Sequence, residues 1–110
     1  MTKDKKIVEI KINHRNRAYK KLDKYGMYES LFERWGEKQF YVAIEEMSEL
    51  QKELCKMLRK GDLSNLEQIK EEIVDVGIML EQLICIFKLS LRELDEIKEH
   101  KLQRTKAILY

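Results

Sequence analysis

The sequence predicts an all-α protein, built as a helical bundle of about four helices. The 110-residue chain contains no proline and only four glycines, so the turn signals of a sheet protein are scarce. Apolar residues also recur at helical spacing along its longest uninterrupted stretches. A chain of this length suits a single compact domain.

Residues 1–27 form the first predicted part, a basic N-terminal arm with a short helix. Residues 1–24 carry nine Lys or Arg against three acids, and the short helix is expected to end at Gly26. The arm is interpreted as a solvated face. Nucleic acid is not the expected partner, because the whole chain carries a formal charge of only +2.

Residues 28–110 form the second predicted part, a helical domain. A short helix is expected over residues 28–35 and a long one over residues 37–60, because Gly36 and Gly61 follow them as stop signals. The long helix also ends in basic residues, which complement the dipole at a helix C-terminus.

Two capping boxes predict where the last two helices start. Ser64 and Ser90 are each followed three residues later by Glu, the pattern in which serine and glutamate satisfy free amides at a helix N-terminus. The first of these helices should run to about Phe87, and the second toward Leu109.

The helix after Ser64 is apolar on nearly every side, so it has to be covered on every side. Three other helices of one short chain can hardly do this, and a homodimer or homotetramer with a hydrophobic interface is therefore expected. The residues that make the helix apolar are Ile73, Val74, Val76, Ile78, Met79, Leu80, Leu83, Ile84, Cys85, Ile86 and Phe87.

The same stretch does not predict a membrane protein. Residues 73–91 include Asp75 and Glu81, which makes a poor membrane span. Cys55 and Cys85 lie in apolar helical stretches without CxxC spacing, and we interpret them as reduced core residues of a cytoplasmic protein.

Two pairs of carboxylates stand three residues apart on consecutive helices: Glu46 with Glu49, and Glu72 with Asp75. Residues i and i+3 share one face of a helix, so both members of a pair can reach one ion. The helical neighbours of Asp75 are like charges or hydrocarbon, which an external cation would offset. Oxygen ligands without a nearby His or Cys favour Mg²⁺, with Mn²⁺ as a substitute.

The arrangement Glu45-Glu46-x-x-Glu49, a spacer, then Glu72-x-x-Asp75 resembles the signature of the MazG-like all-α nucleoside triphosphate pyrophosphohydrolases. The segments 35–39 and 101–104 also look like flanking segments of small phage and Gram-positive members of that family. The resemblance covers roughly residues 28–108.

What the resemblance implies is hydrolysis of a nucleoside triphosphate between its α and β phosphates, giving a monophosphate and pyrophosphate. Carried over by position, the two acid pairs would bind Mg²⁺, and Glu45 or Glu71 would orient or deprotonate the attacking water, with the choice between them open. The expected substrate contacts come from one basic pair on the last helix and from two residues before the first acid pair: Lys101, Arg104, Trp35 and Gln39.

One position departs from the family pattern. Many relatives carry a polar or aromatic residue one turn after the second acid pair, where this chain has Ile78 and Met79. Base selectivity is therefore not predicted.

Simpler interpretations stay open for these residues. Glu45 and Glu71 can be solvent-facing acids, and the basic pair a solvated surface. Two rival functions also remain: a non-catalytic helical oligomer that binds nucleic acid or a protein partner through its basic N-terminus, and a structural bundle whose acids form salt bridges between subunits.

Overall fold

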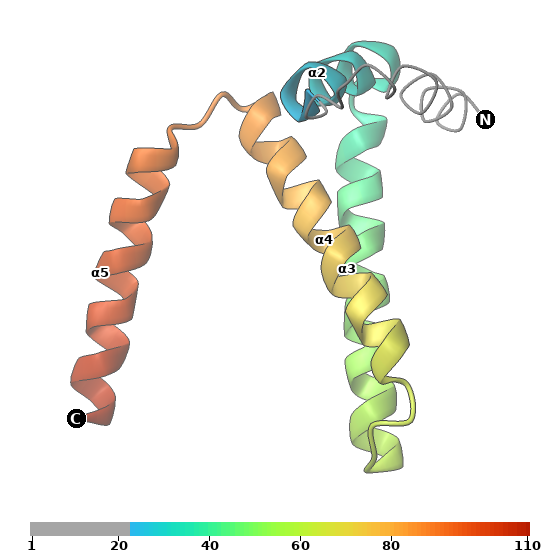
Figure 1. Cartoon of the computed structure of the whole chain (residues 1–110), viewed down its shortest axis with the longest axis vertical. Coiled ribbons are helices and arrows are strands. Elements are labelled where there is room, and N and C mark those ends of the chain that lie inside the picture. Colours follow the sequence, from blue (N-terminus) through green and yellow to red (C-terminus); the bar gives the residue numbers. More distant parts are fainter. Residues whose placement is uncertain (1–22) are drawn as a thin grey trace, which may run out of the picture.

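The computed structural model describes residues 23–110 and confirms the all-α prediction. Four helices follow one another, with no strand among the described residues. They are α2 (Lys24–Trp35), α3 (Lys38–Lys60), α4 (Leu66–Ile86) and α5 (Leu91–Leu109). α3 and α4 form an antiparallel hairpin, and α2 crosses the end of it where α3 begins and α4 finishes (Figure 1). The expectations for residues 1–22 lie outside the described part.

The helix expected to stop at Gly26 instead passes through it. α2 starts at Lys24, because the carboxylate of Asp23 accepts a hydrogen bond from the Gly26 amide at 3.0 Å and so caps the first turn. A Cβ at position 26 would collide with that carboxylate, which explains why glycine fits there. The predicted boundary between residues 27 and 28 therefore falls inside a continuous helix.

The hairpin turn differs from the predicted capping box. Gly61 ends α3 in the left-handed conformation (φ 72°), as expected, and its amide donates to the Met57 carbonyl. α4 then begins after Asn65, one residue later than Ser64, and neither residue makes a side-chain cap. The Asn65 amide group instead donates to the backbone carbonyl and the carboxylate of buried Glu53, at 3.0 and 2.8 Å. Asn65 thus joins the loop to α3.

Few apolar side chains are buried in the described chain: Tyr28, Ala43, Ile69 and Met79. The seam between α3 and α4 is partly polar, since Gln39 and Gln82 are buried against each other with a 2.7 Å hydrogen bond. Much of the apolar surface that a compact bundle would bury is therefore exposed to solvent.

α5 lies apart from the rest of the described structure. Its predicted cap is confirmed, because the Ser90 hydroxyl accepts a hydrogen bond from the Glu93 amide at 3.2 Å. Lys88, in the connection from α4, takes the left-handed conformation (φ 53°), which residues other than glycine rarely adopt. From there α5 runs beside the hairpin without packing on α2, α3 or α4 (Figure 1). None of α2 to α5 combines the length and hydropathy that crossing a bilayer requires.

Candidate metal centre

Three of the four carboxylates proposed as metal ligands meet at the α3–α4 seam. Glu46 projects from α3, and Glu72 and Asp75 project from α4; one oxygen of each lies within 4.8 Å of the others. The antiparallel hairpin produces this meeting, because it places the middle of α3 beside the middle of α4. No ion pair within residues 23–110 involves any of the three. Their charges are therefore not offset by a neighbouring Lys or Arg of the described chain.

Glu72 is the most buried member of the cluster. Its side chain lies one turn beyond Gln68, whose amide donates a 2.8 Å hydrogen bond to Oε1 of Glu72. The other oxygen, Oε2, is buried and has no hydrogen-bond partner among the described residues. A buried carboxylate oxygen without a partner costs free energy, and a bound cation removes that cost.

The pKa of Glu46 is raised above its usual value. Partial burial is the largest cause, and the neighbouring charges of Asp75 and Glu72 add to it, as does a hydrogen bond to Asp75. Each of these effects disfavours the ionised form of Glu46. A divalent cation among the three carboxylates would reverse this balance, because it favours the ionised form of every ligand.

Glu49, the fourth expected ligand, lies outside the group of three. It is half-buried one turn along α3 from Glu46, and its carboxylate forms a loose 3.9 Å ion pair with Lys52. Glu45 and Glu71, the expected catalytic acids, are both exposed on the helices that carry the cluster. Glu45, Glu49 and Glu71 therefore lie on the same two helices as the cluster but outside it.

The expected substrate-binding residues do not gather around the cluster. Lys101 and Arg104 lie on α5, where they line a shallow depression formed by that helix alone. Trp35, at the end of α2, carries the Arg34 guanidinium 5.2 Å from its ring. Gln39 is buried, and its side-chain amide is already engaged by Gln82. Within one copy, none of the four faces the three carboxylates.

Two contacts that support the site were missed by the sequence analysis. Gln68 orients Glu72, and its position four residues before that acid is the signal that points to it. The Gln39–Gln82 pair lies one heptad from Glu46 on α3 and from Asp75 on α4, so it continues the same seam. Only the pairing of the two helices reveals that contact.

Comparison with known proteins finds no matching family model, no matching curated protein and no matching solved structure. The geometry of the described residues therefore carries the functional argument. Membership of the MazG-like family stays a prediction.

Proposed function

We propose that the protein is a Mg²⁺-dependent nucleoside triphosphate pyrophosphohydrolase of MazG-like type, which releases a nucleoside monophosphate and pyrophosphate. One observation carries the proposal: three carboxylates from two helices meet at the seam, and the buried Oε2 of Glu72 has no partner in the described chain. Partly buried carboxylates that lack a positive partner destabilise the folded state, and a bound cation would offset that cost. The predicted acid motifs supply the same residues.

The donor set fits a hard divalent ion. Glu46, Glu72 and Asp75 offer carboxylate oxygens only, which suits Mg²⁺ or Mn²⁺ better than a metal that prefers nitrogen or sulfur. We propose Glu49 as a further ligand, because a change of side-chain rotamer would release it from its long ion pair with Lys52. When bound, Mg²⁺ supplies charge neutralisation for the triphosphate and a more acidic water.

The proposed roles of Glu45, Glu71, Lys101 and Arg104 depend on their exposure to solvent. Glu45 and Glu71 are open to solvent beside the ligands, so either carboxylate can accept a hydrogen bond from a water held near the cluster. Lys101 and Arg104 are free to contact phosphate oxygens only if α5 approaches a hairpin, which it does not do within the described chain. We therefore propose that the enzyme works as a homo-oligomer on a cytoplasmic nucleotide pool.

Metal-linked stability and product analysis test the proposal together. Thermal unfolding with and without Mg²⁺ should show stabilisation, about 2.7 kcal/mol when the free ion is 100-fold above its dissociation constant. Asp75→Asn should lose this gain and all nucleotide turnover. Glu67→Gln makes the same chemical change at an exposed position of α4 and should keep both.

A panel of canonical and modified nucleotides identifies the bond that is cut. Pyrophosphate with a monophosphate is the expected product pair, whereas orthophosphate would mean that a different bond breaks. Full turnover by Asp75→Asn would refute the assignment. Salt-dependent nucleic-acid binding without hydrolysis would support the alternative of a non-catalytic oligomer, whose basic arm lies outside the described residues.

A further inference from the structure

Polar contacts recur along the α3–α4 seam at intervals of seven residues on α3. Each of three residues of α3 meets a polar residue of α4 or of the turn before it: Gln39 meets Gln82, Glu46 meets Glu72 and Asp75, and Glu53 meets Asn65. An interval of seven returns a helix to nearly the same direction, so these contacts form one polar line along the seam. The acid cluster therefore lies between two hydrogen-bonded contacts.

Gln39 and Gln82, which we call the amide pair, form the contact farthest from the hairpin turn. Only 7% of Gln39 and 5% of Gln82 is exposed, and the Gln39 side-chain amide donates to Oε1 of Gln82 at 2.7 Å. A buried amide without a partner costs free energy. Any register in which these two side chains do not meet leaves both amides unpaired. The amide pair therefore disfavours every register of α3 against α4 except its own.

The amide pair and the acid cluster belong to the same register. Gln39 stands seven residues before Glu46 on α3, and Gln82 stands seven residues after Asp75 on α4. Seven residues span about 10.5 Å along a helix. Because the two helices run in opposite directions, contact between Gln39 and Gln82 brings Glu46 level with Asp75 (Figure 1).

The carboxylates do not select this register by themselves. Glu46 and Asp75 carry like charges when ionised, and like charges at this distance repel each other. A slide of α4 by one helical turn would separate them and relieve the repulsion. Contacts elsewhere along the seam therefore have to hold the two acids together in the absence of a metal ion.

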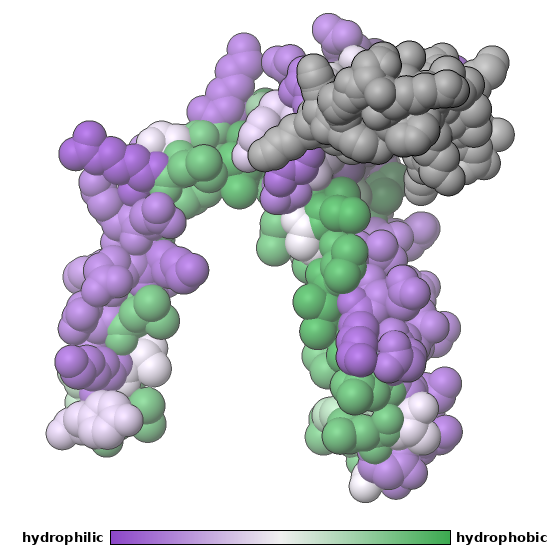
Figure 2. All heavy atoms as spheres, in the orientation of Figure 1, coloured by the Kyte–Doolittle hydropathy of each residue, from purple (hydrophilic) through white to green (hydrophobic). Residues whose placement is uncertain are grey.

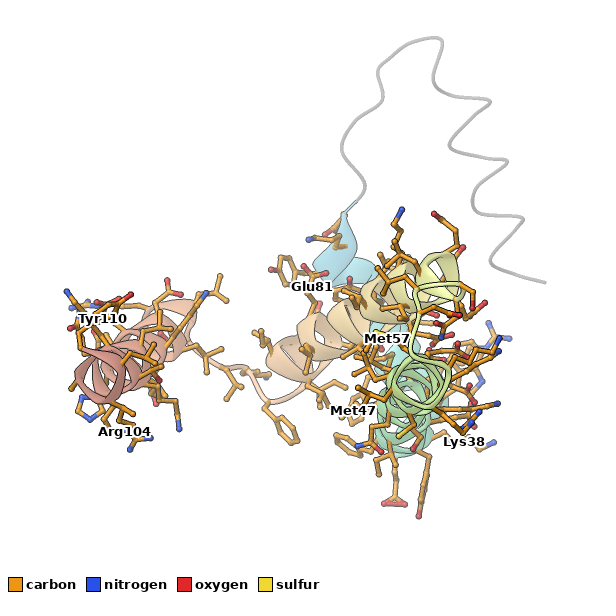
Figure 3. The ribbon with its side chains drawn as sticks, turned by 90° about the horizontal axis from the view of Figure 1, so that it is seen from below. Lys38, Met47, Met57, Glu81, Arg104 and Tyr110 are labelled. Carbon is orange, nitrogen blue, oxygen red and sulfur yellow. The ribbon has the colours of Figure 1, made fainter. Side chains whose placement is uncertain are left out.

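Apolar packing defines the register only weakly. Ala43 and Met79 are buried on the same stripes as the amide pair, but one is small and the other is flexible. In Figure 3, Met57 lies on the side of α3 toward α4, and Lys38 lies on the opposite side. Figure 2 shows apolar surface that continues along the hairpin on the side facing α5. Neighbouring registers therefore offer similar apolar contacts, which are not directional.

We propose that the amide pair fixes the register of α3 against α4 and thereby positions Glu46 opposite Asp75 for metal binding. The two glutamines act through the carboxylates and do not touch the ion, so they are positioning residues. This role in metal binding rests on the proposed Mg²⁺ site, whereas the register itself can be measured without metal.

The stack of Phe40 on Phe87 is the competing contact at the same end of the hairpin. The two ring centroids lie 5.6 Å apart. Aromatic pairs are favourable over centroid distances of about 4.5–7 Å, so they tolerate a shift that would break a hydrogen bond. The aromatic stack is therefore the weaker determinant of the register.

Pulsed electron paramagnetic resonance measures the register directly. Spin labels are attached through Ser48→Cys on α3 and Lys70→Cys on α4, both at exposed positions, in a background that carries Cys55→Ser and Cys85→Ala. An excess of unlabelled protein suppresses distances between copies. The protein with its amide pair intact should give one narrow distribution of distances.

Replacing the amide pair by leucines tests the proposal. Gln39→Leu combined with Gln82→Leu leaves no buried amide unpaired, so stability should be retained. The distance distribution should nevertheless broaden by about 5 Å, one helical turn, and binding of Mn²⁺ as the metal probe should weaken about 10-fold. Gln51→Leu makes the same chemical change at an exposed position of α3 and should alter neither property. An unchanged distribution in the double variant would overturn the proposal.

Phe40→Leu tests the competing contact and should leave the distances unchanged. Broadening by Phe40→Leu but not by the leucine pair would assign the register to the aromatic stack. Broadened distances with undiminished Mn²⁺ affinity would overturn the positioning role. If the protein with its amide pair intact binds no Mn²⁺, the metal assignment fails, and the distances alone decide the register.

A second variant serves if the leucine pair does not fold. Gln39→Met keeps the length of the side chain and removes the hydrogen-bond donor. It should broaden the same distance distribution, and a narrow distribution in Gln39→Met would overturn the proposal.

Discussion

Carboxylate oxygens of Glu46 on α3 and Asp75 on α4 lie within 4.8 Å of each other, and a hydrogen bond between these two side chains helps to raise the pKa of Glu46. Two ionised carboxylates so close repel each other, which disfavours the ionised form of Glu46, and a bound cation would offset that repulsion. Through this pair, the stability of the folded protein should depend on both pH and bound metal.

The first prediction concerns pH in the absence of metal. Because the pKa of Glu46 is raised by folding, the folded state binds more protons than the unfolded state above pH 4.5, the ordinary value. This contribution to stability is fully present below pH 4.5 and is lost as pH rises through the folded-state pKa. Urea unfolding in a chelator should show the decline, and Glu46→Gln should flatten it. An identical slope in both proteins would contradict the pKa shift.

The second prediction separates the three central carboxylates from Glu49. Asp75→Asn should weaken Mg²⁺ binding more than Glu49→Gln, because Asp75 already lies in the cluster while Glu49 has to leave Lys52 first. Titration of the metal-dependent shift in melting temperature gives both affinities. Lys52→Met should tighten binding slightly if Glu49 is a ligand, because it removes the competing ion pair, worth up to about 1 kcal/mol. Wild-type affinity in Glu49→Gln would remove Glu49 from the site.

The third prediction concerns the loop that sets the hairpin. Asn65→Ala removes both hydrogen bonds to Glu53 and leaves the buried carboxylate without that donor, at a cost of about 2–3 kcal/mol. Combining it with Glu53→Leu should cost less than Asn65→Ala alone, since no buried charge remains unpaired. Urea unfolding measures both. Strictly additive losses would show that the two side chains do not act together.

The fourth prediction concerns the docking of α2 on α4. The Tyr28 hydroxyl donates a 2.8 Å hydrogen bond to Glu81, and burial raises the pKa of Tyr28 to about 12, with the hydrogen bond as the second cause. Tyr28→Phe should destabilise the protein by about 1–2 kcal/mol. Lys24→Met removes the exposed ion pair to the same carboxylate and should destabilise the protein less than Tyr28→Phe, because solvent screens that pair. If Lys24→Met lost more stability than Tyr28→Phe, the ion pair rather than the tyrosine hydrogen bond would be the main contact that docks α2 on α4.

The fifth prediction compares the two serines that begin capping boxes in the sequence. Ser90→Ala should destabilise the first turn of α5 by about 1 kcal/mol, because its hydroxyl accepts the Glu93 amide. Amide hydrogen exchange at residues 91–95 measures this locally, as α5 does not pack on the other described helices. Ser64→Ala should change stability by less than about 0.5 kcal/mol, since Ser64 caps nothing. Equal effects would mean that both boxes form.

The sequence alone located most of the helices correctly. α3 ends where Gly61 was expected to end it, and α5 starts at the predicted capping box. These features depend on residues close together in the chain, which is why local rules capture them. The predicted stop at Gly26 was wrong because the carboxylate of Asp23 caps the first turn of α2. This cap outweighs the low helix propensity of one glycine.

The acid pairs also illustrate the limit of local patterns. Spacing of three residues showed that Glu72 and Asp75 share a helical face, but not that Glu46 rather than Glu49 would stand opposite them. That choice depends on the register of α3 against α4, which the Asn65–Glu53 contact and the Gln39–Gln82 pair help to set. Both contacts join residues far apart in the chain.

By itself, then, the amino-acid sequence determined an all-helical chain with acids grouped on two helices, because helix periodicity and end signals act over a few residues. The tertiary structure decided which carboxylates meet, which oxygen of Glu72 is buried without a partner, and that α5 does not pack on the hairpin. Those outcomes depend on how whole helices pack against one another, which the residue pattern within a single helix does not specify.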